Sequence, residues 1–382
     1  MNNFELCNPT KIIFGADSMD KIAQNIRPFG KKVLITYGNG SIKKNGIYQK
    51  VINQLENFDV REFGGIEPNP RVETIREAIK KFKDFNPDFF LAIGGGSVID
   101  GTKLLASSML YNGDPWDFLI QKTAEPIKYI PFGVVLTLSA TGSEMNRGAV
   151  ITNWTTHEKK GFKREQNYPV FSVLDPQNTY SVPNDQTAYG IVDAFSHVLE
   201  QYIQTKEDTP LQDRFCESIL LTLIENSSKV LKSPEDYSAR ANIMLCACMA
   251  LNNLLRSGTN EDWATHDIEH QLSAFYDIPH AAGLAIITPR WMKVVKDQKA
   301  KKLLQYGERV WGLRGSDAEI IKKAIDATYE FFGSLGVKMS LKDWQISNEH
   351  FPTIISRLEK KGIGEIPLTA EQIKKILEDC LE

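Results

Sequence analysis

A short stretch near residue 270 carries a large share of the side chains that could bind a metal. Three of the six histidines, His266, His270 and His280, lie within it. His266 and His270 are four residues apart, so on a helix they occupy one face, one turn from each other. Pro279 is expected to end or bend that helix. His280 would then follow in a loop that could return toward the same point.

A second pair with the same spacing lies about seventy residues upstream, where Asp193 precedes His197 by four positions. Two helices that each present ligand-type atoms from one face commonly build a divalent metal site. One carboxylate and three imidazoles suit Zn²⁺ or Fe²⁺, and an open coordination position would make the ion a Lewis acid toward a substrate oxygen. The predicted ligands are Asp193, His197, His266 and His280. His270 is the candidate to give or take a proton beside the metal.

Each pair alone has a simpler explanation. Asp193 and His197 could form an ordinary i, i+4 contact on a helix surface. The combination favours a metal site, because four of the six histidines and an embedded aspartate fall on two apolar helices and the turn after one of them. The chain lacks the H-E-x-x-H motif here, which argues against a zinc protease.

A glycine-rich turn, residues 94–97, follows an apolar run and opens a helical pattern. Glycines let the backbone approach a pyrophosphate, and the helix N-terminus offers free N–H groups, so Gly95, Gly96 and Ser97 are candidate cofactor contacts. The turn is not G-x-G-x-x-G, and a tight turn without a ligand is the alternative. Asp100, in the first helical turn, is either a partner of the helix dipole or a ribose contact.

A second loop, residues 137–144, also follows a predicted strand and is rich in hydroxyl and small side chains. Thr137 and Leu138 begin it, and its composition suits contacts with phosphate, ribose or carboxamide groups of a cofactor. A capping box formed by Thr141 and Glu144 at a helix start is a second interpretation, compatible with the first.

The turn after the first predicted strand bears on the choice of cofactor. An NAD-preferring site usually places an acidic side chain near the ribose 2′-OH, but no acidic residue follows this strand before Glu56. Small residues, a hydroxyl and two lysines would instead accept a 2′-phosphate, which predicts NADP(H). The residues concerned are Gly38, Asn39, Ser41, Lys43 and Lys44. The alternative is that the lysines form a solvated helix face.

The elements that position these residues divide the chain in two. Up to Pro183, β-branched runs at 32–37, 60–63, 88–93, 129–136 and 170–174 alternate with helical patterns. This alternation predicts a mainly parallel, Rossmann-like sheet that binds ligands at the carboxyl ends of its strands.

Beyond Pro183 the pattern is helical only. Helices are expected at 187–204, 211–231, 237–255, 261–275, 300–311, 318–335 and 370–381. We therefore predict an α/β dinucleotide-binding domain over 1–183 and an all-helical metal-binding domain over 184–382.

Composition is that of a globular chain: 382 residues with 42% hydrophobic and 24% charged side chains. The net charge of −3 gives no support for binding nucleic acid or a membrane surface. No apolar run approaches the roughly 18 residues of a membrane span, and the N-terminus lacks a signal pattern. Five cysteines without C-x-x-C spacing predict a reduced, cytoplasmic protein.

Several motifs, in order, resemble those of the iron-containing (group III) alcohol dehydrogenases, most nearly the NADPH-dependent butanol dehydrogenase and aldehyde reductase branch. The likeness covers essentially the whole chain. The matching segments are residues 8–15, 63–70, 94–103, 136–144 and 262–266.

The resemblance implies a dehydroquinate synthase-like architecture with the active site in the cleft between two domains. It also implies reversible hydride transfer between NADP(H) and an aldehyde whose oxygen is polarised by Fe²⁺ or Zn²⁺. The family's metal ligands fall on Asp193, His197, His266 and His280, and His270 falls near the nicotinamide and substrate. Its cofactor contacts fall on Gly38, Ser41, Asn69, Gly95, Gly96, Ser97, Thr137, Leu138, Asn146 and Lys159. Asn39 stands where close relatives often have glycine. A homodimer is implied, with residues 1–15 as a pairing edge.

Two other functions are open at this point. One is a metal-dependent lyase of the dehydroquinate synthase type, which uses NAD transiently; its polyanionic substrate would need more basic residues around the metal helices than the sequence offers. The other is a non-catalytic nucleotide- or metal-binding protein. Turnover of butanal with NADPH separates the three.

Overall fold

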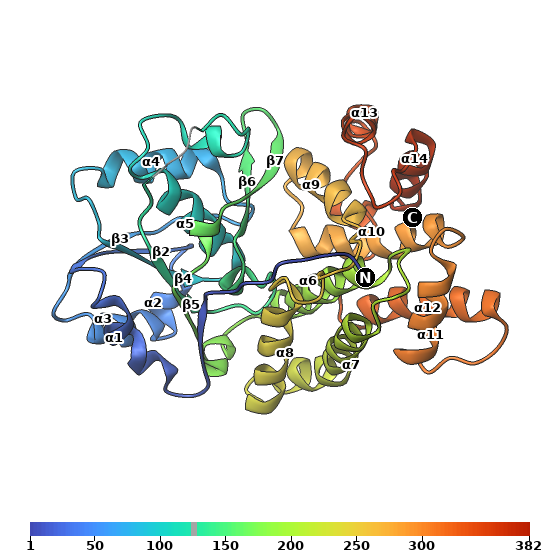
Figure 1. Ribbon diagram of the computed structural model, residues 1–382, viewed down its shortest axis with the longest axis horizontal. Coiled ribbons are helices and arrows are strands. Elements are labelled where there is room, and N and C mark those ends of the chain that lie inside the picture. Colours follow the sequence, from blue (N-terminus) through green and yellow to red (C-terminus); the bar gives the residue numbers. More distant parts are fainter. Residues whose placement is uncertain (124–127) are drawn as a thin grey trace. The chain divides into compact units, whose positions relative to one another are not determined.

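The computed structural model describes residues 1–123 and 128–382 (Figure 1). Its contacts divide the chain into two compact units. The sheet unit comprises Cys7–Val182 with Pro234–Cys248, and the helical unit comprises Met1–Leu6, Pro183–Ser233 and Met249–Glu382.

The sequence predicted a single boundary near residue 183, and the observed division differs from it in two segments. The first six residues belong to the helical unit, where the Asn2 backbone N–H donates to the Gly258 carbonyl at 2.9 Å. Residues 234–248 belong to the sheet unit, because Met244 and Cys248 are fully buried in one of its hydrophobic cores. Both exchanges depend on contacts distant in sequence, which local patterns do not reveal.

The sheet unit is built on six parallel strands in the order β1-β8-β5-β4-β2-β3. These strands are β1 (Lys11–Phe14), β2 (Lys32–Tyr37), β3 (Asp59–Phe63), β4 (Phe89–Gly94), β5 (Phe132–Leu136) and β8 (Phe171–Leu174). The parallel, Rossmann-like sheet predicted from the sequence is confirmed. The sequence did not reveal the antiparallel hairpin of β6 (Gly148–Asn153) and β7 (Glu158–Lys163), whose second strand is too charged to read as a strand.

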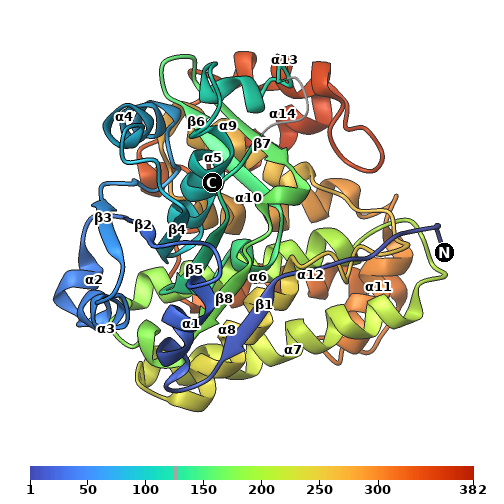
Figure 2. The ribbon, with the colours of Figure 1, turned by 60° about the vertical axis from the view of Figure 1, so that its left-hand side comes forward.

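Helices cover both faces of this sheet (Figures 1 and 2), which is why its central strands β4, β5 and β8 are buried along their whole length, whereas the edge strand β3 carries charged side chains. On one face, alternate strand residues such as Leu34 and Phe90 pack against α4 (Val72–Phe82) and α5 (Gly96–Ser108). The other face, with Val33 and Leu91, packs against η1 (Ser18–Lys21), α1 (Ile22–Ile26) and α3 (Ile47–Gln54). The helix expected after β2 is interrupted: α2 (Ser41–Lys44) ends before Gly46, which has a left-handed φ of 82°.

Three neighbouring strands carry the loops singled out in the sequence. In the sheet β2 lies beside β4 and β4 beside β5, with Tyr37 paired to Ile93 and Gly94 paired to Leu136. Because parallel strands end at one edge, the turns that begin at Gly38, Gly95 and Thr137 emerge next to each other. The short 3₁₀ helix η3 (Ser143–Met145) follows in the last of these loops.

Residues 183–382, all of which the structure describes, contain helices and no strand. The helices are α6 (Asn184–Tyr202), α7 (Pro210–Lys232), α8 (Tyr237–Ala250), α9 (Ala264–Tyr276), α10 (His280–Val295), α11 (Ala300–Arg309), α12 (Asp317–Ser334), α13 (Phe351–Lys361) and α14 (Ala370–Asp379). Most of α8 packs in the sheet unit. No helix in the described part of the chain is long and apolar enough to cross a membrane.

Two of these helices were not expected. α10 is buried on nearly all sides and contains Pro289, so it shows no amphipathic period. α13 begins with a proline in its first turn, which a helix tolerates there. The first of these changes the prediction for His280, which is the opening residue of α10 after Pro279 rather than part of a loop. α10 packs against both α6 and α9, and these three helices carry the predicted metal ligands.

Candidate metal and dinucleotide sites

Three of the four predicted metal ligands converge within the helical unit. Ligand-type atoms of Asp193 on α6, His266 on α9 and His280 on α10 all lie within 4.8 Å of one another. Asp193 and His266 are buried, whereas the His280 side chain is 24% exposed. This is the spacing of donors around a single ion, and the open side is at His280.

The other two histidines of the prediction lie beside this group. The His197 ring stacks on His266 with ring centroids 4.6 Å apart, and its Nδ1 is 3.5 Å from Asp193 Oδ1. It is not one of the three residues whose donors share the 4.8 Å spacing. His270 is half-buried, with its ring centroid 6.2 Å from that of His266 and 5.6 Å from that of His280. It therefore lies next to the candidate site rather than at its centre.

The residues present fit a divalent metal. His266 Nε2 is buried and has no hydrogen-bond partner among the described residues. Its Nδ1 is occupied by a hydrogen bond with the Glu200 carboxylate. An imidazole with one nitrogen held by a carboxylate and the other unpaired is the usual state of a histidine that binds a metal. A carboxylate with neighbouring imidazoles is also a suitable donor set for Zn²⁺ or Fe²⁺.

Burial shifts the pKa values of His197 and Glu200 in opposite directions. The pKa of His197 is well below its ordinary value because burial, and then the neighbouring His266 and His280, disfavour the protonated ring. His197 therefore stays neutral, as a metal-binding imidazole must. Burial raises the pKa of the Glu200 carboxyl, and the adjacent His266 opposes that rise.

Two buried glutamates at this site were not predicted from the sequence. Glu200 contacts His266, and Glu269 contacts His280 through its Nδ1. Helical spacing held a signal for both: Glu200 follows Asp193 by seven residues and Glu269 follows His266 by three, so each lies near the ligand face of its helix. Their partners lie on other helices and could not be read from spacing.

The predicted pyrophosphate contacts lie at the start of α5 in the sheet unit. Gly95 precedes the helix in an extended conformation, and no side chain among the described residues caps its first turn. The N–H groups of Gly96 and Ser97 are thus available to an anion. A Cβ at Gly96 would come within 2.3 Å of Thr141 Cγ2, so glycine is needed there for the approach of the second loop.

Asp100, for which the sequence left a helix-dipole partner and a ribose contact open, is hydrogen-bonded within the sheet unit. Its Oδ1 accepts a hydrogen bond from Ser143 Oγ at 2.5 Å, and its Oδ2 accepts from the Val150 N–H at 2.8 Å. Both oxygens therefore hold the second loop and strand β6 against α5.

Lys103, one turn further along α5, was not identified from the sequence. Its fully buried Nζ donates to Ser143 Oγ at 2.7 Å, Asn146 Oδ1 at 3.0 Å and the Gly148 carbonyl at 2.7 Å. Burial lowers the pKa of Lys103 to about 8. Asn146, a cofactor contact implied by the resemblance, is thereby held in place from inside the unit.

The capping box expected between Thr141 and Glu144 does not form. Gly142, in a left-handed conformation, is the residue before η3, and no side chain caps that turn. Thr141 Oγ1 instead accepts from the Ser143 N–H at 3.1 Å. Glu144 is buried, and burial raises its pKa to about 7. The buried surroundings of Glu144 therefore override the local capping pattern.

Asn69 and Lys159 are two further contacts implied by the resemblance, and the fold brings them together. Lys159 Nζ, on β7, donates to Asn69 Oδ1 at 2.9 Å, although the residues are 90 positions apart. Both side chains are buried. Neither position is distinctive in the sequence alone.

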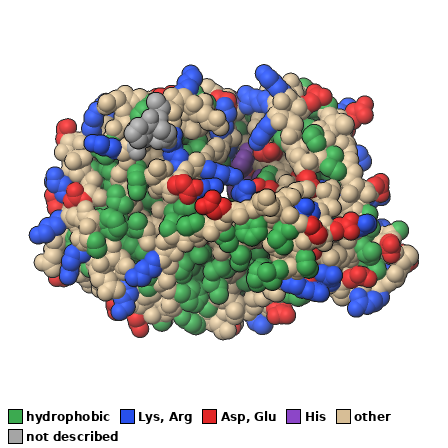
Figure 3. Space-filling model, viewed as in Figure 1, with side chains coloured by type: hydrophobic (Ala, Val, Ile, Leu, Met, Phe, Trp, Pro, Cys, Tyr) green, Lys and Arg blue, Asp and Glu red, His purple; other side chains and the backbone are tan. Residues whose placement is uncertain are grey.

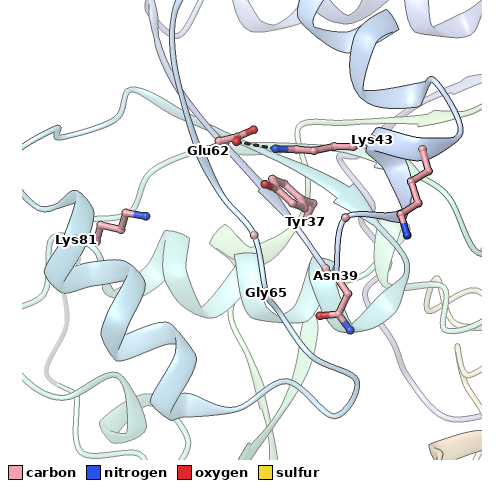
Figure 4. A pocket seen from close by; sticks show the side chains of 10 residues that line it. Tyr37, Asn39, Lys43, Glu62, Gly65 and Lys81 are labelled. Carbon is pink, nitrogen blue, oxygen red and sulfur yellow. Dashed lines mark hydrogen bonds and ion pairs between the residues drawn. The ribbon is translucent and has the colours of Figure 1, made fainter.

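The turn after β2 opens into a cavity of about 720 Å³, lined in part by Gly38 and Asn39 (Figure 4). Ser41 begins α2 beside it. Lys43 and Lys44 line the cavity as expected, and Lys81 on α4 adds a third lysine across from them. The remaining lining residues are Tyr37, Gly40, Glu62, Gly64 and Gly65.

An acidic side chain that was not predicted at this position also lines the cavity. Glu62, on β3, accepts from Lys43 Nζ at 2.7 Å. The turn itself has no acidic residue, but the neighbouring strand β3 supplies one, so the lack of an acid in the turn does not by itself distinguish NADP(H) from NAD(H).

Charges on one face of the molecule are mixed in sign. On the face drawn in Figure 3, lysines and arginines are interspersed with aspartates and glutamates. Such a surface agrees with the net charge of −3.

The sheet unit has the glycine turn and helix start of a dinucleotide-binding fold, and the helical unit gathers carboxylate and imidazole donors for a metal. Together these two features define a metal-dependent dinucleotide enzyme. Residues 9–176 match the family described as iron-containing alcohol dehydrogenase, and residues 187–381 match the C-terminal part of the Fe-containing alcohol dehydrogenase family. The chain belongs to the iron-containing alcohol dehydrogenase family. It is an enzyme that interconverts alcohols and aldehydes.

Individual relatives match over almost their full length. The chain is 48% identical over 369 residues to the NADPH-dependent aldehyde reductase YqhD of Escherichia coli, covering 96% of this chain and 95% of that one. It is 45% identical over 388 residues to the probable NADH-dependent butanol dehydrogenase 1 of Bacillus subtilis, covering 100% of both. The crystal structure of YqhD superposes with a TM-score of 0.95 at 46% identity, covering 100% of this chain and 99% of that one.

Proposed function

We propose that this protein is a metal-dependent, NADP(H)-linked alcohol dehydrogenase and aldehyde reductase that acts on primary alcohols such as butanol and on the matching aldehydes. The observation that carries the proposal is the grouping of ligand-type atoms from Asp193, His266 and His280. Within the described residues, His266 Nε2 is buried and has no hydrogen-bond partner. Family membership supports the same conclusion.

The proposed metal ligands are Asp193, His197, His266 and His280. Iron is the expected ion, because the family is described as iron-containing, and zinc would suit the same donors. When bound, a divalent ion supplies a Lewis acid for the substrate oxygen, and reduced nicotinamide supplies the hydride. His270, half-buried beside the ligands, is proposed to give or take the proton.

The cofactor is proposed to bind the sheet unit through the loops that follow β2, β4 and β5. The first turn of α5 would bind the pyrophosphate through the N–H groups of Gly96 and Ser97. Further proposed contacts are Gly38, Asn39, Ser41, Asn69, Gly95, Thr137, Leu138, Asn146 and Lys159.

NADP(H) is proposed over NAD(H) because three lysines, Lys43, Lys44 and Lys81, line the cavity after β2 and would favour a 2′-phosphate. YqhD is named as NADPH-dependent, whereas the Bacillus relative is named as NADH-dependent. The choice between NADP(H) and NAD(H) therefore rests on the residues around this cavity, and the rates with the two cofactors test it.

The test is NADPH oxidation with butanal by metal-stripped protein, repeated after addition of Fe²⁺ under anaerobic conditions or of Zn²⁺, with NADH in parallel. We expect turnover that returns with the metal and is faster with NADPH. Turnover unaffected by metal removal would contradict the role of the ion. Absence of turnover with every metal and both cofactors would contradict the proposed activity.

Three further features are proposals. Dinucleotide binding is assigned to the sheet unit and metal binding to the helical unit. A homodimer is proposed to form through β1, an edge strand of the sheet, and light scattering would measure it. A reduced, cytoplasmic setting agrees with the five free cysteines.

A further inference from the structure

We propose that two buried glutamates, Glu200 and Glu269, set the affinity of the metal site by fixing the tautomer and orientation of His266 and His280. This inference rests on the proposed function, because it assumes that those histidines bind a metal. Neither glutamate is a proposed ligand; each acts through a histidine.

Glu200 is anchored independently of the ring that it contacts. It has no exposed surface, and its Oε1 accepts from the backbone N–H groups of Thr265 at 2.7 Å and His266 at 3.3 Å. These groups belong to the first turn of α9, where N–H donors and the helix dipole favour a carboxylate. Its Oε2 is then directed at His266 Nδ1. The Glu200 carboxylate, on α6, is therefore held in a fixed position, and the His266 ring must turn its Nδ1 toward it.

Glu269 has the corresponding relation to His280. It is also fully buried, its Oε1 is held by the Ser273 hydroxyl, and its Oε2 contacts His280 Nδ1. The contact depends on Gly283 one turn into α10, because a Cβ there would lie 2.8 Å from Glu269 Cγ. Glycine at this position lets α10 approach α9 closely enough for the two side chains to meet.

A carboxylate at Nδ1 requires that this nitrogen carries the proton, so the lone pair lies on Nε2. His266 Nε2 has no hydrogen-bond partner among the described residues, and His280 Nε2 lies 3.7 Å from Asp193 Oδ1. Both Nε2 atoms thus belong to the group of ligand-type atoms that includes the Asp193 carboxylate. The two glutamates also place negative charge near a site that would receive a dication, which makes the imidazoles stronger donors.

The direct test is the affinity for Zn²⁺, measured by chelator competition with the full-length protein and its Glu200→Gln and Glu269→Gln variants. Glutamine keeps the size of the side chain and removes its charge. We expect the dissociation constant to rise on the order of 10- to 100-fold in each variant. In ¹⁵N NMR of histidine-labelled protein, the Nδ1-protonated tautomer should dominate in the wild type and be reduced at the affected ring in each variant.

Two more variants separate this role from a general structural one. Glu217→Gln is the matched control: Glu217 is a buried glutamate of the same unit that bonds to Tyr202 and Arg309 and touches no proposed ligand. It should leave Zn²⁺ affinity unchanged even where it lowers the melting temperature. Gly283→Ala should weaken Zn²⁺ binding as Glu269→Gln does, because the added methyl displaces the same side chain.

Affinities within about twofold of wild type in both glutamine variants would overturn the inference, as would an equal loss in the Glu217→Gln control. If the wild type binds Zn²⁺ and turns over butanal while the variants bind equally well, the inference fails and the proposed function stands. If the wild type binds no metal, both fail.

Discussion

Lys43 on α2 and Glu62 on β3 form an ion pair with Nζ and Oε1 2.7 Å apart, at the wall of the cavity that follows β2. The Lys43 ammonium also lies over the rings of Tyr37 and Tyr48, 5.0 and 4.8 Å from their centroids. The hydrogen bond to Glu62 raises the pKa of Lys43 above its ordinary value. Glu62 thus offsets part of the positive charge that would attract a 2′-phosphate.

Glu62→Gln should increase the preference for NADPH over NADH. Removing the carboxylate leaves the Lys43 charge uncompensated and removes repulsion of the phosphate, so the ratio of kcat/KM values for the two cofactors should rise about three- to tenfold. The pair is well exposed, so a larger effect is not expected. Glu56→Gln, an exposed position outside the cavity, is the control. An unchanged ratio would show that Glu62 has no part in cofactor choice.

His280→Ala should remove both the bound metal and turnover. Loss of one proposed ligand leaves too few donors around the ion, and loss of Lewis-acid stabilisation worth several kcal/mol lowers kcat by at least about 100-fold. Metal content and NADPH oxidation are measured on the same samples. His157→Asn, in the sheet unit, should retain both. Full metal content with normal turnover in the His280 variant would remove His280 from the site.

Glu144→Gln should change how stability depends on pH. Burial raises the folded-state pKa of Glu144 from 4.5 to about 7, with Lys103, Asp100 and Cys248 as its polar neighbours. Between these values the folded protein binds the proton more tightly than the unfolded chain, so stability falls as pH rises toward 7. The full cost above pH 7 is about 3 kcal/mol, at about 1.4 kcal/mol for each pKa unit.

Glutamine cannot ionise. The melting temperature of the variant should therefore be close to that of the wild type near pH 4.5 and should exceed it by a growing margin as the pH rises to 7.5. Melting temperatures of both proteins across this range provide the measurement. Glu77→Gln, at an exposed glutamate, should show no such divergence. A constant difference between the Glu144 variant and wild type at every pH would contradict the prediction.

Gly96→Ala should weaken cofactor binding and stability together. The added Cβ would lie 2.3 Å from Thr141 Cγ2, so the second loop must move away from the start of α5. Overpacking of this kind costs about 1–3 kcal/mol. Fluorescence titration with NADPH and the melting temperature report the two effects. At Gly161 the nearest atom to an added Cβ is 3.7 Å away, so Gly161→Ala should be nearly neutral.

Much of the fold could be predicted because its signals are local. The strands at residues 33–37 and 89–93 are apolar except for Thr36, and a strand buried on both faces leaves that pattern whatever lies around it. The helix α10 was missed for a related reason: burial on all sides removes the periodicity that distinguishes a helix from other apolar segments.

The sequence by itself determined the donor types and their grouping on helices, because an i, i+4 spacing places Asp193 with His197 and His266 with His270 through backbone geometry alone. Only the tertiary structure decided which residues meet across elements: His280 at the start of α10, Glu200 against His266, Glu62 against Lys43, and Lys159 against Asn69. Such contacts depend on how helices and strands pack together. The local sequence around a residue does not show which distant residue will pack against it.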